Sequence, residues 1–155
     1  MRVDDATVLI IEDGDEYIDG LSRYVVGPTY LQARSGSAAA ALLAEHRVDL
    51  LYLDMRFDRI PRAALLGDHG EATREHNGDP ERGWRYLANN QGLFILAALR
   101  EAGHAELPAI LAYDFSREAR RFDFLARGWP RLDWVPDAVT ATEIRARMAK
   151  ALQAV

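Results

Sequence analysis

Carboxylates follow two apolar runs of the sequence, at the point where each run ends. Glu12 and Asp13 come directly after TVLII (7–11), and Asp54 lies near the end of VDLLYLDMRF (48–57). Short continuous apolar runs are typical of strands that are buried on both faces of a parallel sheet. The carboxyl ends of such strands form the crevice in which open α/β sheets bind ligands. These three acids are therefore the first candidates for chemistry.

Several carboxylates in one crevice repel one another and raise one another's pKa values, so a bound cation would be favourable. Mg²⁺ takes oxygen ligands, commonly one or two carboxylates together with water and phosphate. Glu12, Asp13 and Asp54 suit such an ion, and Asp54 could then act as the nucleophile that forms an aspartyl phosphate. The alternative is that Glu12 and Asp13 are ordinary loop acids and that Asp54 is a turn or N-cap residue.

The elements that must position these acids alternate along the chain. The expected strands are 7–11, 30–33, the run 48–57, 108–113 and 132–135. The expected helices are 15–26, capped by Asp15, 38–45, 93–99, 117–127, capped by Asp114 or Ser116, and a last helix from Thr140 or Thr142. This β-α alternation predicts one α/β domain over residues 1–155, with a parallel sheet and right-handed crossovers.

Composition narrows the class of protein. The chain has 155 residues, a net charge of -5, no cysteine and a single lysine, Lys150. The negative charge argues against direct nucleic-acid binding, and the absence of cysteine excludes disulfides. No apolar stretch approaches the roughly 20 residues that a membrane-spanning helix needs. We therefore expect a cytoplasmic protein with no membrane contact.

Residues 58–91 interrupt the regular pattern. From Asp54 to Gly92 the chain runs 38 residues, whereas a βα connection usually has about 2–6. We expect an insertion at about 58–90 with at most short helices at 62–66 and 81–87. Its composition permits either a functional or a disordered loop. Because it leaves from directly beside Asp54, we expect a mobile lid over the acidic crevice, with arginines able to reach a phosphoryl group. His69 and His76 could ligate a metal, but six intervening residues and no helix to align them favour solvated loop histidines. The arginines are Arg56, Arg59, Arg62, Arg74, Arg82 and Arg85.

Several motifs in order resemble a known family. They are Glu12-Asp13 after VLII, the segment ARSGSAAAALLAEHRVDLLYLD (33–54), Gly92-Leu93 at a helix entry, Pro108 opening a strand and the turn at Gly128. With these features the chain resembles a receiver domain of bacterial two-component response regulators, over its whole length except roughly residues 58–90.

The resemblance implies a flavodoxin-like, doubly wound, five-stranded parallel sheet of order 2-1-3-4-5. It implies that Asp54 is the phosphoacceptor and that Mg²⁺ is held by Glu12, Asp13, Asp54 and the backbone carbonyl of Arg56. The implied partner is a sensor histidine kinase or another signalling protein. A second copy of the chain, docked through the fourth helix, fifth strand and fifth helix, is a further expectation. The domain would be a signalling module and not an enzyme.

The sequence also departs from the family pattern. Tyr113 stands at the switch position, where receivers carry Thr or Ser, and Ser116 comes three residues later. The lysine that receivers place after the fifth strand is absent, because Val135 or Asp137 occupies its place. Losing a charge-assisted hydrogen bond to a phosphoryl group costs on the order of 1.5–3 kcal/mol. Arg56 is a candidate phosphate contact that could replace it.

Three functional hypotheses follow. The first is a receiver that is phosphorylated at Asp54 and acts through protein contacts. The second is a pseudo-receiver that binds partners without phosphorylation, in keeping with the missing lysine and hydroxyl residue. The third is a haloacid-dehalogenase-like phosphatase, because Asp54 to Asp58 (DMRFD) loosely resembles the aspartate pair of that family. We rank it last, since here the pair follows the third strand and its spacing is one residue too long.

Aromatic residues mark the expected contact surface. Phe122, Phe124, Trp129 and Trp134 lie among arginines in the region of the fourth helix and fifth strand of the expected fold. Aromatic and arginine side chains are enriched at interface hot spots. We expect about two of these rings in the core and at least one substantially exposed.

Overall fold

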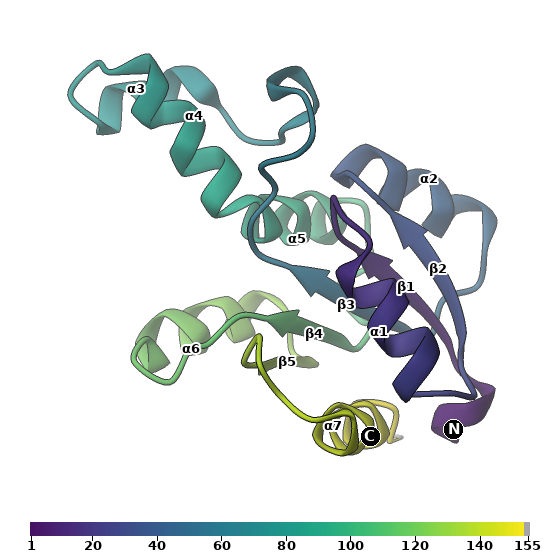
Figure 1. Ribbon diagram of the computed structural model, residues 1–155. Coiled ribbons are helices and arrows are strands. Elements are labelled where there is room, and N and C mark those ends of the chain that lie inside the picture. The colour runs from purple at the N-terminus through teal and green to yellow at the C-terminus, as the bar shows by residue number, and fades with distance from the viewer. Residues whose placement is uncertain (154–155) are drawn as a thin grey trace.

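The computed structural model describes residues 1–153 and contains one five-stranded parallel sheet (Figure 1). The strands are β1 (Thr7–Ile11), β2 (Thr29–Ala33), β3 (Leu50–Asp54), β4 (Ala109–Ala112) and β5 (Leu132–Val135). Their order in the sheet is β2-β1-β3-β4-β5, and every neighbouring pair is parallel. The predicted flavodoxin-like sheet of order 2-1-3-4-5 is confirmed.

Helices cover both faces of the sheet, and two further helices project from the domain. They are α1 (Glu16–Tyr24), α2 (Gly36–Glu45), α3 (His69–Glu75), α4 (Pro80–Asn89), α5 (Gln91–Glu101), α6 (Ala119–Gly128) and α7 (Ala141–Ala151), with short 3-10 turns η1 (Val3–Asp5) and η2 (Arg62–Ala64). Side chains of α1 and α7 pack on one face, and those of α2, α5 and α6 pack on the other. No helix within residues 1–153 is long and apolar enough to cross a membrane.

Period-two alternation along β3 decides which face each of its side chains joins. Leu51 and Leu53 belong to the core beneath α2 and α5, whereas Leu50 and Tyr52 belong to the core beneath α1 and α7. All four are essentially buried, as a central parallel strand requires. Asp54 continues the alternation, so it lies on the same face as Tyr52.

Two of the predicted caps differ in the structure. Asp15 is the N-cap residue of α1 but its side chain makes no capping hydrogen bond; Oε2 of Glu12 accepts one from the N–H of Tyr17 instead, over 3.0 Å. The α6 helix begins at Ala119, because Asp114 uses its carboxylate on the N–H of Ser116 in a local turn. An aspartate that bonds two residues ahead favours a turn over a helix start.

The segment 58–90 is not the weakly structured loop that its composition suggested. Its α3 and α4 helices form a hairpin that projects from the domain, at the upper left of Figure 1. Asp68 caps α3 and Asp79 caps α4, in each case by accepting from a first-turn N–H. The rings of His69 and Trp84 stack between the two helices with centroids 3.7 Å apart. Local caps and one stacked pair thus give the segment a structure of its own.

The base of the hairpin is fixed to the domain core. The N–H of Phe57 donates to the carbonyl of Ala88 over 2.9 Å, and Phe57 is fully buried. Gln91, also fully buried, accepts from the N–H of Leu66 over 2.7 Å and donates to the carbonyls of Leu66 and Leu87, over 3.1 Å each. The first bond joins the two ends of the segment to each other, and those of Gln91 join Leu66 and the end of α4 to the start of α5.

Candidate functional site: an acidic crevice at the strand ends

The predicted acids lie at the carboxyl edge of adjoining strands. Glu12 and Asp13 follow β1 and are 2% and 9% exposed, and Asp54 is the half-buried last residue of β3. The neighbouring α5 helix enters very close to this point, since the N–H of Gly92 donates to the carbonyl of Met55 over 2.9 Å. A Cβ at Gly92 would lie 2.5 Å from the carbonyl oxygen of Asp54, so only glycine fits there.

Each of the three carboxylates accepts a backbone hydrogen bond. Oδ1 of Asp54 accepts from the N–H of Met55 over 2.8 Å, and Oε2 of Glu12 from α1, as described above. Oδ2 of Asp13 accepts from the N–H of Arg59 over 2.7 Å. The last bond confirms that the first residues of the 58–90 segment border the acidic crevice. The acids therefore hold the loops of the crevice in place.

Burial and mutual repulsion shift the acids of the crevice towards their neutral forms. Burial raises the pKa of Asp54 to about 6, the N–H of Met55 opposes the rise, and the charges of Asp13 and Asp137 add to it. Burial likewise raises the pKa of Glu12 to about 7, with further contributions from Glu16 and Asp54. These opposing contributions are those expected of carboxylates that share a poorly solvated space.

Asp137 also belongs to the crevice, which the sequence did not predict. It was noted only as an occupant of the place where receivers carry lysine, yet in the structure its negative charge acts on Asp54. Val135, the other candidate for that place, is fully buried in the core. The parallel register of β5 brings the residues after this strand to the same edge as Asp54. Lys150 is exposed on α7, where it borders a groove with Arg131 and Asp133.

The predicted switch residues lie after β4. The ring of Tyr113 packs edge-on against Phe115, with centroids 4.7 Å apart, and the guanidinium of Arg121 lies 5.8 Å from its centroid. Glu118, as a hydrogen-bond partner, raises the pKa of Tyr113. Ser116 is exposed in the turn before α6.

The arginines expected to supply a positive charge have other partners or face solvent. Arg59 pairs with Glu16, and Arg62 pairs with Glu81 while it lies 5.7 Å from the centre of the Trp84 ring. Arg56 is exposed just beyond Asp54. The side chains of Arg59 and Arg62 are therefore occupied by surface acids.

The expected magnesium site is not assembled. In the part of the chain that the structure describes, no group of three or more His, Asp or Glu side chains is arranged to hold a metal ion. The reason lies in the hydrogen bonds of the acids: Glu12 turns towards α1 and Asp13 towards Arg59. All three proposed carboxylate ligands thus each use one oxygen on a backbone N–H, so the residues as arranged do not fit a magnesium centre.

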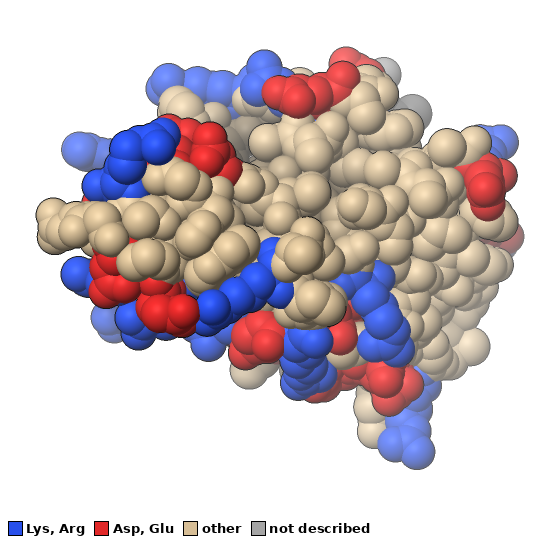
Figure 2. Space-filling view, turned by 90° about the horizontal axis from the view of Figure 1, so that it is seen from above, with Lys and Arg blue, Asp and Glu red and all other residues tan. Residues whose placement is uncertain are grey.

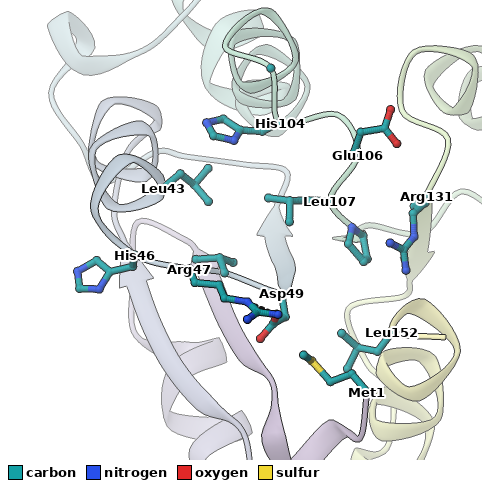
Figure 3. A pocket seen from close by; sticks show the side chains of 13 residues that line it. Met1, Leu43, His46, Arg47, Asp49, His104, Glu106, Leu107, Arg131 and Leu152 are labelled. Atoms are coloured by element: carbon teal, nitrogen blue, oxygen red, sulfur yellow. Dashed lines mark ion pairs between the residues drawn. The ribbon is translucent and has the colours of Figure 1, made fainter. Parts of the chain in front are cut away.

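A cavity lies at the amino ends of the strands, opposite the crevice (Figure 3). It has a volume of about 480 Å³ and is bordered by Asp49, Pro108 and Arg131, which directly precede β3, β4 and β5. Its charges are mixed, and Nε of Arg47 lies 3.6 Å from Oδ1 of Asp49. Because the cavity faces the amino ends of the strands, it is separate from the crevice at Asp54.

Comparison with known proteins identifies the fold. No family model matches the sequence, and no curated protein matches it. Solved structures do match along nearly the whole chain. A response-regulator receiver domain from Clostridium thermocellum is 13% identical, with a TM-score of 0.61 over 96% of this chain and 94% of that one. Chemotaxis protein CheY4 of Vibrio cholerae is 13% identical, with a TM-score of 0.62 over 95% of this chain and 98% of that one.

A third match is the signal receiver domain of an HD domain-containing protein from Pseudomonas fluorescens. It is 13% identical, with a TM-score of 0.60 over 98% of this chain and 90% of that one. The chain has the receiver fold. Within a receiver fold, Asp54 ends the third strand and Glu12 and Asp13 follow the first, which is the placement that the sequence predicted for them.

Proposed function

We propose that this protein is a receiver-like signalling module that acts through protein contacts and does not depend on phosphorylation. One observation carries the proposal. The charges that act most strongly on the carboxyl of Asp54 are those of Asp13 and Asp137, and both are negative. A phosphoryl group on Asp54 would add further negative charge to this crevice. Without a cation to neutralise these charges, an arrangement of this kind opposes phosphotransfer instead of stabilising it.

The second candidate is phosphorylation of Asp54 with Mg²⁺ held by Glu12, Asp13, Asp54 and the carbonyl of Arg56. It is favoured by the position of Asp54, which is half-buried and ends β3 at the edge where ligands of open α/β sheets bind. It requires Asp13 to ligate the ion through Oδ1, or to release the N–H of Arg59 where both oxygens are needed. The phosphatase hypothesis gains no such support, because Asp58 is exposed.

A phosphodonor experiment separates the two candidates. The protein is incubated with acetyl phosphate and Mg²⁺, and its intact mass is measured. We expect no adduct of about 80 Da, the mass of a phosphoryl group. An adduct that forms on the wild type and is lost in Asp54→Asn would overturn the proposal in favour of a conventional receiver. Asp58→Asn is the matched control, since it removes an exposed carboxylate four residues away.

The region of α6, β5 and α7 is the surface that we propose for protein contacts. Phe124 on α6 is 71% exposed, as expected for at least one of the four aromatic residues, whereas Trp129 is 2% exposed and its Nε1 donates to the carbonyl of Leu107. Figure 2 shows the molecule from above the view of Figure 1. On this other face, basic and acidic side chains are interspersed. Self-association through α6 would appear as a concentration-dependent mass in sedimentation that Phe124→Ser abolishes.

A further inference from the structure

A small cavity of about 150 Å³ lies between α1, β3 and the start of α7. Leu21 of α1, Val25 directly after α1 and Ile144 of α7 form its apolar walls. Tyr52 projects into it from β3, the strand that ends at Asp54. The cavity is smaller than the roughly 300–1,000 Å³ of pockets for drug-sized ligands. Its size suits a single side-chain end or a small head group.

All the charged residues that line this cavity are acidic. They are Glu16 and Asp137, and in residues 1–153 no Lys or Arg side chain lines it. Glu16 is paired with Arg59, whereas Asp137 is exposed and forms no ion pair within the described chain. The cavity therefore presents one free carboxylate beside apolar walls. A cation that reached it would exchange solvent for a direct charge-assisted hydrogen bond.

A second, independent feature is the hydroxyl group of Tyr52. Tyr52 is 1% exposed, lines the cavity and makes no side-chain hydrogen bond within residues 1–153. In the same range, no fully enclosed polar side-chain atom lacks a hydrogen-bond partner. The Tyr52 hydroxyl therefore opens onto the cavity and not onto closed core. A buried hydroxyl without a protein partner points to a polar group that completes it.

Aromatic faces complete the lining. The rings of Tyr17 and Tyr52 meet edge to face, with centroids 5.4 Å apart. Tyr24 borders the cavity from the exposed side of α1, and the guanidinium of Arg23 lies 5.9 Å from the centre of its ring. The negative face of an aromatic ring attracts ammonium and guanidinium groups, and sets of such rings bind alkylated ammonium ligands. Burial and the nearby carboxylates of Asp54 and Asp137 raise the pKa values of Tyr17 and Tyr52. Both hydroxyls thus stay protonated and neutral.

We infer that this cavity binds the cationic end of an alkylamine or alkylguanidine, such as a lysine or arginine side chain of a partner protein. Asp137 receives the positive charge, Tyr17 and Tyr52 lie beside the alkyl stem and the hydroxyl of Tyr52 bonds the ligand. The inference depends on the proposed function in one respect: that the partner is a protein. The binding of a cation in a cavity next to the Asp54 crevice goes beyond that function.

Binding is tested by following the Tyr17 and Tyr52 ring signals by NMR during titration with n-butylammonium and n-butylguanidinium. Neutral n-butanol is the matched probe, and a blocked Gly-Lys-Gly peptide presents the same cation from a polypeptide. We expect saturable shifts with the two cations, with a Kd on the order of 1 mM for so small a ligand. Binding of the peptide identifies a protein side chain as the source, and binding of the free amine alone identifies a small molecule.

Two conservative variants decide the mechanism. Asp137→Asn should weaken binding of either cation about tenfold or more, because a charge-assisted bond is lost. Tyr52→Phe should weaken it less, since only the hydroxyl is removed. Asp123→Asn, an exposed acid of α6, is the control and should change nothing. The inference is overturned if butanol binds as tightly as the cations, if no shift saturates, or if Asp137→Asn binds like the wild type. None of these outcomes alters the phosphodonor result, so the two proposals fail separately.

Discussion

The carboxylate of Asp13 accepts a hydrogen bond from the backbone N–H of Arg59, with 2.7 Å between Oδ2 and the nitrogen. An acid of the crevice thereby holds the first turn of a segment 46 positions later in the chain. Any ion or partner that needs both oxygens of Asp13 must first release Arg59. The state of the crevice and the position of the 58–90 segment are therefore linked.

This link predicts the behaviour of one amide proton. Asp13→Ala removes the acceptor, so the N–H of Arg59 should exchange with solvent at least about tenfold faster, as expected when a hydrogen bond to a charged group is lost. Glu16→Gln removes only the exposed side-chain partner of Arg59 and should leave this exchange rate nearly unchanged. Equal rates in the wild type and Asp13→Ala would show that the bond does not hold the segment.

The ionisation of Glu12 and Asp54 should make the stability of the protein depend on pH. Their pKa values in the folded state, about 7 and about 6, lie above the ordinary values of 4.5 and 3.8, so the folded state binds the extra protons. Their contribution is complete below about pH 4 and is lost as the pH rises through 6 and 7. The free energy of unfolding should fall by about 1–3 kcal/mol per group between pH 4 and pH 8.

Urea denaturation at the two pH values measures this change. Glu12→Gln keeps an acceptor for the N–H of Tyr17 but cannot ionise, so it should stabilise the protein at pH 8 and flatten the pH profile. Asp54→Asn should act in the same direction. A Glu12→Gln profile that is parallel to that of the wild type would mean that Glu12 ionises in the folded protein as it does in the unfolded chain.

Replacing each of two glycines by alanine should change the stability of the protein in opposite directions. Gly20 lies within α1, and a Cβ there would meet no atom within 4 Å, so Gly20→Ala should stabilise the protein by about 0.5–1 kcal/mol through helix propensity. At Gly92 the added Cβ would meet the carbonyl of Asp54 at 2.5 Å, and Gly92→Ala should destabilise by about 1–3 kcal/mol. Thermal unfolding of the two variants tests the close approach of α5 to β3. A Gly92→Ala variant as stable as the wild type would refute that approach.

Gln91 should be a structural residue of the hairpin base. Gln91→Leu keeps the volume but leaves the N–H and carbonyl of Leu66 without their partner, at a cost of about 1–3 kcal/mol for each unsatisfied group. We expect lower stability and faster proteolysis between residues 67 and 79. Gln32→Leu is the control, because that amide bonds the carbonyl of Gly14 at the other side of the sheet. Unchanged proteolysis in Gln91→Leu would show that α3 and α4 are held by other contacts.

The sequence by itself determined the sheet. Short apolar runs that alternate with helical patterns predicted five parallel strands, because a buried strand needs uninterrupted apolar residues. The acids after two of these runs predicted the placement of Glu12, Asp13 and Asp54 at the carboxyl ends of strands, where ligands of open α/β sheets bind. It failed for α3, since seven residues such as HGEATRE carry no apolar periodicity and owe their helix to the cap of Asp68 and to packing against α4.

Only the tertiary structure decided what the acids do. Whether Asp13 faces a metal ion or the N–H of Arg59 depends on the path of a segment that begins four residues after Asp54, and no pattern in the sequence encodes that path. The role of Asp137 likewise depends on the register of β5 beside β4, which brings a second negative charge, besides that of Asp13, to act on Asp54. Sequence spacing places residues along one strand, whereas charge interactions act through space between strands that are distant in the chain.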